Sequence, residues 1–167
     1  MPDFALLPWR PEYAADIAPL ADDPGVAANL RDAFPQPYTL ADAEAFVADC
    51  LRPLATRLMR AIVIDGRAVG SIALFQGQDI YRQCAELGYW LGRPYWRQGV
   101  MTRAVGEICA LGFQALPIRR IYAEPFARNA PSRRVLEKNG FLLEGIMRQG
   151  AVKNGQVLDW CMYARLK

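Results

Sequence analysis

The hydrophobic period of the sequence changes at Pro94-Tyr95-Trp96-Arg97-Gln98-Gly99-Val100-Met101-Thr102-Arg103-Ala104. Before this segment, residues 84–91 alternate with a period of two, which is typical of a strand. After it, apolar residues recur every three or four positions, which predicts a helix; they are Val100, Ala104, Ile108, Leu111 and Ala115. The segment therefore leads from a strand into the start of a helix through Gly99.

A helix start of this kind exposes backbone N–H groups. The first four N–H groups of a helix have no acceptor within it, and the helix dipole adds partial positive charge there. Arg93, Arg97 and Arg103 surround the turn. Such a turn can hold a phosphate. The alternative is an ordinary strand-to-helix turn with solvated arginines, and the segment alone does not separate the two.

Length and composition indicate one globular domain covering residues 1–167, since 53% of the residues are hydrophobic and 22% charged. No segment approaches the roughly 20 apolar residues of a membrane span. Met1-Pro2-Asp3 does not resemble a signal peptide, so we expect a cytoplasmic protein without membrane attachment. There is no histidine, and the four cysteines lack metal-ligand spacing, so no metal site is expected.

Charge is distributed unevenly along the chain. Residues 1–50 hold two basic and nine acidic side chains, whereas residues 51–167 hold 18 basic and eight acidic ones. The basic part contains the candidate phosphate turn. Because no basic run with interleaved aromatic residues occurs, nucleic acid is not expected as a partner.

Periodicity, capping residues and turn residues predict an α+β domain. The expected elements are a strand at 4–9, helices at 11–20, 24–29 and 40–51, a hairpin at 61–75 around Asp65-Gly66, a strand at 84–91, a helix from 100, a strand at 120–124, a helix from 130 to Asn139-Gly140, and a final strand pair at 141–148 and 156–165. Thr39 and Asp42 resemble a capping box, and Asn129 is the expected cap of the helix that contains Pro131. The predicted sheet is largely antiparallel.

Two motifs in this order of elements resemble the GNAT superfamily of N-acetyltransferases. The first is the turn at residues 96–101, which keeps the central Gly99 of the family pattern but has Trp96 and Met101 at its outer positions. The second is Asn129-Ala130-Pro131-Ser132 followed by a helix and Gly140-Phe141. The run Gly88-Tyr89-Trp90-Leu91 and the aromatic residue at position 96 are most similar to the branch of the RimJ/RimL ribosomal-protein alanine acetyltransferases.

The resemblance implies the GNAT fold, an α+β fold with a mixed, mostly antiparallel sheet of about seven strands, helices on both faces and a splay between strands 4 and 5. It implies acetyl-CoA as cosubstrate, with the pyrophosphate on the backbone of the turn and a bulge near the end of strand 4 that frees the N–H of Leu91. The residues implied to contact acetyl-CoA are Tyr89, Trp90, Leu91, Arg97, Gln98, Gly99, Val100, Met101, Thr102, Asn129, Ser132 and Lys138. No metal is implied.

The implied chemistry is direct transfer of the acetyl group to an amine held in the same site. Glu86 is the best-placed carboxylate for removing the amine proton, directly or through water; the alternative is a structural salt bridge. Many relatives carry a tyrosine acid seven residues after the motif asparagine, but Leu136 occupies that position. Ser132, beside Asn129, is the expected replacement for contacting the sulfur; otherwise Asn129 simply caps the helix.

The acceptor is expected to be a primary amine, either a protein N-terminus or a small cationic amine, because residues 1–50 are acidic. Phe34 and Tyr38, in a proline-rich loop, are the candidate acceptor-binding residues, unless they only cover the core. The alternative function is an acyl-CoA-binding sensor module without turnover. A monomer or a homodimer is compatible with the sequence.

Overall fold

The computed structural model describes residues 2–167. In chain order its elements are β1 (Ala5–Leu7), α1 (Tyr13–Ala21), α2 (Pro24–Ala27), α3 (Leu40–Cys50), β2 (Arg57–Ile64), β3 (Arg67–Gln76), β4 (Cys84–Leu91), α4 (Val100–Ala115), β5 (Arg120–Ala123), α5 (Ala130–Lys138), β6 (Leu142–Lys153) and β7 (Gln156–Leu166). Short 3-10 helices lie at Asp79–Tyr81 and Arg93–Tyr95. The predicted elements are thus found in the predicted order, with α1 starting at Tyr13 instead of Pro11.

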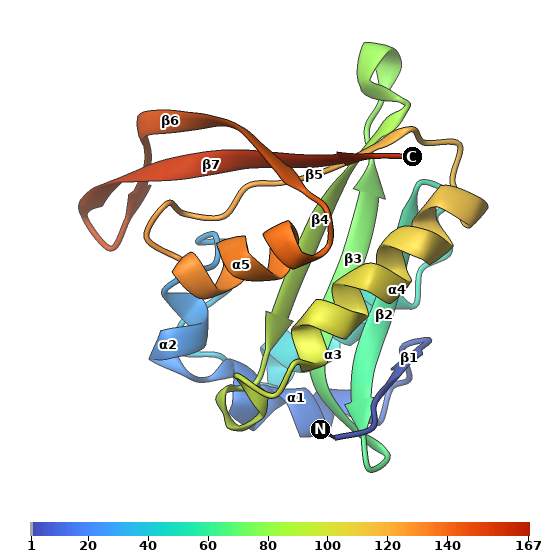
Figure 1. Cartoon of the computed structure of the whole chain (residues 1–167). Coiled ribbons are helices and arrows are strands. Elements are labelled where there is room, and N and C mark those ends of the chain that lie inside the picture. Colours follow the sequence, from blue (N-terminus) through green and yellow to red (C-terminus); the bar gives the residue numbers. More distant parts are fainter. Residues whose placement is uncertain (1) are drawn as a thin grey trace.

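The strands form one seven-stranded sheet in the order β1-β2-β3-β4-β5-β7-β6. All neighbouring pairs are antiparallel except β4 and β5, which are parallel. The chain crosses from β4 to β5 through α4, which lies across one face of the sheet, while α1 and α3 lie behind it (Figure 1). This confirms the mixed, mostly antiparallel sheet with helices on both faces.

Each face of the sheet has its own apolar core because side chains alternate along the strands. On the α4 side, Leu87 and Leu91 of β4 pack with Val100, Ile108 and Leu136 from α4 and α5. On the other side, a second core is built from α1, α3 and the strand residues beneath them, and it includes Trp90. Consecutive residues of β4 therefore face different helices.

Positive backbone φ angles occur at both predicted hairpin turns. Asp65 (φ 50°) and Gly66 (φ 79°) join β2 to β3, and Asn154 (φ 51°) and Gly155 (φ 73°) join β6 to β7. Two successive positive φ angles are the geometry of a type I′ turn, which matches the right-handed twist of paired strands. The Asp-Gly and Asn-Gly pairs adopt this geometry with little strain.

One structural expectation is wrong. The register between β3 and β4 runs without a shift from Gly70↔Leu91 to Gln76↔Ala85, so the bulge predicted near the end of β4 is not present in this strand. The shift lies instead between β2 and β3, at Ile62/Val63. Strand β4 remains regular because β3 pairs with it along its whole length.

A capping box starts α3, as the sequence predicts. The Asp42 N–H donates to Thr39 Oγ1 (3.2 Å), and the Thr39 N–H donates to Asp42 Oδ2 (2.7 Å). Replacing Thr39 by alanine should lower the free energy of unfolding by about 1 kcal/mol because the helix loses a cap. Denaturant unfolding measures this, with the exposed Thr56→Ala as control. An unchanged midpoint for the Thr39 variant would contradict the role of the cap.

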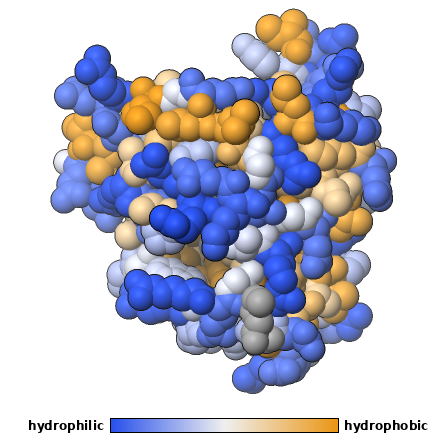
Figure 2. Space-filling view, viewed as in Figure 1, coloured by the Kyte–Doolittle hydropathy of each residue, from blue (hydrophilic) through white to orange (hydrophobic). Residues whose placement is uncertain are grey.

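Apolar side chains also gather on the outer surface along the β6–β7 hairpin, at the upper left of Figure 2. Leu142 and Val152 of β6 and Val157 of β7 are all more than half exposed. Strand β6 is the edge of the sheet. Among the helices of residues 2–167, none is both long and apolar enough to cross a membrane.

Candidate functional site

Strands β4 and β5 separate soon after they begin. Only Cys84, Ala85 and Glu86 pair with β5, at Arg120, Ile121 and Tyr122. The rest of β4, residues 87–91, has no partner on β5; α5 lies on this side of β4, while α4 crosses in front of β3 (Figure 1). The predicted splay is therefore present, and it arises from early divergence of the strands without a bulge.

The hydrogen-bond pattern of β4 shows which backbone groups face the splay. The Gly77 N–H donates to the Cys84 carbonyl and the Gly92 N–H donates to the Val69 carbonyl, so the even-numbered residues of β4 bond to β3. The N–H groups of the odd-numbered residues, Leu91 among them, consequently point toward the splay. The Leu91 carbonyl there accepts from Trp96 Nε1 at 2.6 Å.

The turn after β4 presents a run of unpaired N–H groups. Arg97 and Gly99 have φ angles of 61° and 75°, which turn the chain into α4. None of the six N–H groups from Arg97 to Thr102 donates to another residue of the 2–167 segment, and Arg103 N–H is the first to bond, to the Gly99 carbonyl. Gln98 Nε2 closes the turn by donating to the Pro94 carbonyl (2.7 Å). The turn can therefore accept an anion with its backbone.

Only one of the three arginines that flank this turn in sequence is left without an anionic or backbone partner. Arg93 pairs with Asp23 (2.8 Å) and lies over the Trp96 ring. Arg103 donates to the Pro2 carbonyl and lies over the Phe4 ring. Arg97 is exposed and has no salt-bridge partner within residues 2–167. The positive charge around the turn comes mainly from the backbone and Arg97.

Two hydroxyl groups meet on the α5 side of the splay. Asn129 caps α5, with Oδ1 accepting the Ser132 N–H at 3.3 Å, and contact of both residues with acetyl-CoA stays a prediction. Ser132 Oγ lies 2.7 Å from the Tyr89 hydroxyl. Burial raises the pKa of Tyr89 to about 12, so the phenol keeps its proton at neutral pH. Leu136 is fully buried in the core. Tyr89 of β4 and Ser132 of α5 thus supply a pair of hydroxyls here, whereas Leu136, at the position of the expected tyrosine acid, is apolar.

A charged cluster lies on the opposite face of β4. Arg31 donates to Glu86, which it contacts closely, and to Glu124 Oε2 at 2.7 Å. Burial and the neighbouring Glu86 raise the pKa of Glu124, while Arg31 opposes that rise. Neither Arg31 nor Glu124 is among the site residues predicted from the sequence. Glu124 could have been found, because it directly follows a strand that runs parallel to the strand of Glu86. Nothing in the sequence indicated Arg31.

The aromatic residues of the proline-rich loop form a packed group on this same face. The Phe34 ring lies 4.8 Å from Tyr38 and 5.7 Å from Trp90, centroid to centroid. Tyr38 is buried, which raises its pKa to about 12, whereas Phe34 is only partly buried. Trp90 thus faces the α1 and α3 side of the sheet, away from Tyr89 and Leu91. Acceptor contact through Phe34 stays a prediction.

The remaining predicted contact, Lys138, is exposed in the last turn of α5. The next residue, Asn139, ties this end of α5 to the start of α4, since its Nδ2 donates to the Thr102 carbonyl at 2.9 Å. Lys138 therefore lies at the end of α5 that is joined to the anion-binding turn.

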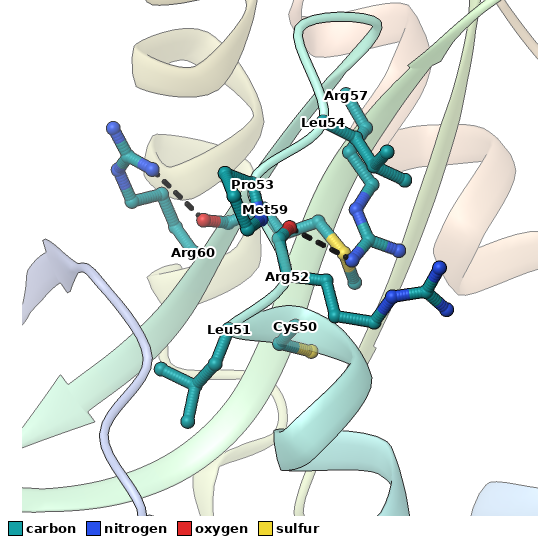
Figure 3. Close-up of a pocket in the computed structure, with 8 residues that line it drawn as sticks. All are labelled: Cys50, Leu51, Arg52, Pro53, Leu54, Arg57, Met59 and Arg60. Atoms are coloured by element: carbon teal, nitrogen blue, oxygen red, sulfur yellow. Dashed lines mark hydrogen bonds between the residues drawn. The ribbon is translucent and has the colours of Figure 1, made fainter.

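A separate pocket of about 200 Å³ lies where α3 meets β2 (Figure 3). Its lining includes Cys50, Met59 and three arginines, but none of the residues described above. One of them, Arg57, is neutralised by Asp49 at 2.6 Å. Within residues 2–167, no group of three or more histidine, cysteine, aspartate or glutamate side chains is arranged to hold a metal. The chemistry-bearing residues thus gather at the splay.

Two curated relatives are similar to this chain. It is 41% identical over 91 residues to "Probable N-acetyltransferase YjcK" of Bacillus subtilis, covering 54% of this chain and 50% of that protein. It is 33% identical over 108 residues to "Ribosomal-protein-serine acetyltransferase" of Escherichia coli, covering 65% and 60%. The matches thus span only about half to three fifths of the relatives' lengths.

Solved structures share the fold. "Mycobacterium smegmatis RimJ in complex with CoA-disulfide" has a TM-score of 0.86 over 98% of this chain and 81% of that one, at 24% identity. The model of the family described as "Acetyltransferase (GNAT) domain" matches residues 3–142, most of the chain. With the splayed strands and the anion-binding turn, this match shows that the chain belongs to the GNAT acetyltransferase family.

Proposed function

We propose that this chain is an N-acetyltransferase that moves the acetyl group of acetyl-CoA to a primary amine. The observation that carries the proposal is the run of unpaired N–H groups from Arg97 to Thr102 beside the splay of β4 and β5. The pyrophosphate of acetyl-CoA would bind to these N–H groups, and its pantetheine arm would enter the splay. Family membership supports this, and so does the CoA complex of the structurally similar RimJ.

In this proposal the thioester carbonyl lies near the Leu91 N–H, which donates to the oxygen as negative charge develops there. The acceptor amine reaches the carbonyl carbon from the Glu86 side of β4. Glu86 removes a proton from the amine, directly or through a water molecule. Most of the acceleration comes from holding the two reactants in line.

As the C–N bond forms, the C–S bond breaks and leaves a CoA thiolate. We place the Ser132 hydroxyl beside this sulfur, as donor of a hydrogen bond or of the proton. A phenol is a stronger acid than an alcohol, so Tyr89 donates to Ser132 Oγ (2.7 Å) and leaves the Ser132 proton free for the sulfur. Tyr89 is a positioning residue here, and solvent restores the proton.

Replacing Ser132 by alanine should lower kcat about tenfold while the KM for acetyl-CoA changes little, because one hydrogen bond to the leaving sulfur is lost. Tyr89→Phe should lower kcat less. The double variant should resemble Ser132→Ala, since Tyr89 acts through Ser132. Tyr81→Phe, at an exposed tyrosine, is the control. Steady-state kinetics with strictly additive losses would contradict the coupling.

The acceptor class follows from similarity to ribosomal-protein acetyltransferases and from the carboxylates on the acceptor face. We propose a protein N-terminal amine or a small cationic amine. The experiment is incubation with acetyl-CoA and a panel of peptides, polyamines and aminoglycosides, followed by mass spectrometry of the products. Acetylation of none of them would reject the proposal.

A further inference from the structure

Arg31 bridges two carboxylates at the point where β4 and β5 begin to diverge. Its Nη2 contacts Glu86 on β4 and lies 2.7 Å from Glu124 Oε2, directly after β5. No other basic side chain within residues 2–167 forms a salt bridge with either carboxylate. Two carboxylates share one cation, so the cluster keeps a net negative charge on the acceptor face of the splay.

The cation is bound in a way that allows its replacement. The side chain of Arg31 is 65% exposed, whereas those of Glu86 and Glu124 are each 26% exposed. An ion pair with so exposed a partner contributes little free energy, because water screens it and the long side chain loses rotamer freedom. Two carboxylates that share one cation still attract a further positive charge. Another cation at this position would therefore compete with Arg31 on nearly equal terms.

Two contacts link the segment around Arg31 to the C-terminal half of the chain. Arg128 donates to the Ala28 carbonyl (2.9 Å), and Lys153 Nζ bonds to Asp32 Oδ1 (2.8 Å). Lys153 is itself buried. The Arg31 side chain can consequently leave the carboxylates by rotation about its own bonds, while the loop that carries it stays in place.

We propose that Arg31 is an internal cation that occupies the position of the acceptor ammonium group between Glu86 and Glu124, and that a cationic amine displaces it on binding. This inference rests on the proposed acetyl transfer. The displaced arrangement puts the acceptor ammonium group beside Glu86, which takes one proton before the nitrogen attacks the thioester carbon. The second proton leaves the nitrogen as the C–S bond breaks and passes to the CoA thiolate, while Glu124 lies on the other side of the bound ammonium group.

The arrangement selects the chemical class of the acceptor. A peptide N-terminus or a polyamine offers an ammonium group without a nearby carboxylate, so it suits two acidic side chains. A free amino acid brings its own carboxylate next to Glu86 and Glu124, which repel it. An acceptor must therefore bind the two carboxylates well enough to displace Arg31. Peptide amines meet this requirement more readily than free amino acids do.

The test compares Arg31→Met, which keeps an unbranched apolar stem but removes the charge, with Arg31→Lys and with the wild type. Arg67→Met, at an arginine whose side chain is 79% exposed, is the matched control. The probe is a short peptide amide with a free N-terminus, varied at saturating acetyl-CoA. We expect Arg31→Met to lower the KM for this amine roughly fivefold with the KM for acetyl-CoA unchanged. Arg31→Lys and Arg67→Met should behave like the wild type.

An unchanged or raised KM for the peptide amide in Arg31→Met overturns the inference. A raised KM confined to free amino acids also overturns it, because Arg31 would then bind the acceptor carboxylate. Calorimetric titration of the same peptide amide in the presence of CoA separates failure of this inference from failure of the proposed function. Tighter binding by Arg31→Met without turnover in any variant would reject acetyl transfer and retain the cation site. Absence of binding to both proteins would reject the site.

Discussion

Replacing Gly99 by glutamate is expected to abolish binding of acetyl-CoA, with a loss of affinity of at least about 100-fold, while the chain still folds. Gly99 lies at the start of α4 with a φ of 75°. A Cβ there is strained and stands among the N–H groups meant for the pyrophosphate. A carboxylate about 4 Å from a phosphate adds repulsion on the order of 4 kcal/mol at an effective dielectric constant of 20.

Calorimetric titration with CoA measures this loss. Gly66→Glu is the matched control, since Gly66 has a φ of 79° and open space around it in the β2–β3 turn. It carries the same backbone strain and the same added charge outside the proposed site. Gly99→Ala should fall between the wild type and Gly99→Glu. If Gly99→Glu binds CoA as the wild type does, the pyrophosphate does not lie on this turn.

Glu86→Gln is expected to lower kcat about 100-fold, in the lower range for loss of a general base, with little change in acetyl-CoA affinity. The glutamine keeps the size of the side chain on β4 but cannot take the amine proton. Because the proposed general base is lost, the pH dependence of the rate should also differ between the variant and the wild type. The measurement is a pH–rate profile with a peptide amine.

Glu107→Gln, at an exposed glutamate of α4, controls for a change of net charge. A Glu86→Gln profile identical to that of the wild type would show that water alone accepts the proton. In that case the contact between Arg31 and Glu86 would be structural.

Local signals in the sequence were sufficient for most of the fold. The Asp65-Gly66 turn, the Thr39 capping box and the Asn129 cap each depend on residues at most three positions apart, and all three are present. The change of period at residues 94–104 located the turn between β4 and α4 correctly. Such features are determined by backbone preferences that tertiary packing here reinforces.

The parts that the sequence did not predict depend on distant contacts. Arg31 lies 55 residues from Glu86 and 93 from Glu124, so no spacing rule connects them. The hydroxyl pair of Tyr89 and Ser132 joins residues 43 apart on β4 and α5. The family-derived bulge in β4 was wrong because regular pairing with β3 keeps that strand straight.

The presence of Leu136 is compatible with a second function on the same fold. It fills the core at the position where a tyrosine acid is expected in relatives, so a chain that binds acyl-CoA without turnover is the competing hypothesis. The hydroxyl pair at Tyr89 and Ser132 favours catalysis, since it supplies a donor near the expected sulfur position. Binding data alone cannot separate the two hypotheses.

The most direct test is release of free CoA thiol from acetyl-CoA, measured with and without a panel of primary amines. Wild type is expected to release thiol only when a cationic amine is present, with one acetylated amine formed per thiol. Gly99→Glu should release none, and Gly66→Glu should match the wild type. Tight binding of acetyl-CoA by the wild type without thiol release for any amine would contradict the account and establish a binding module.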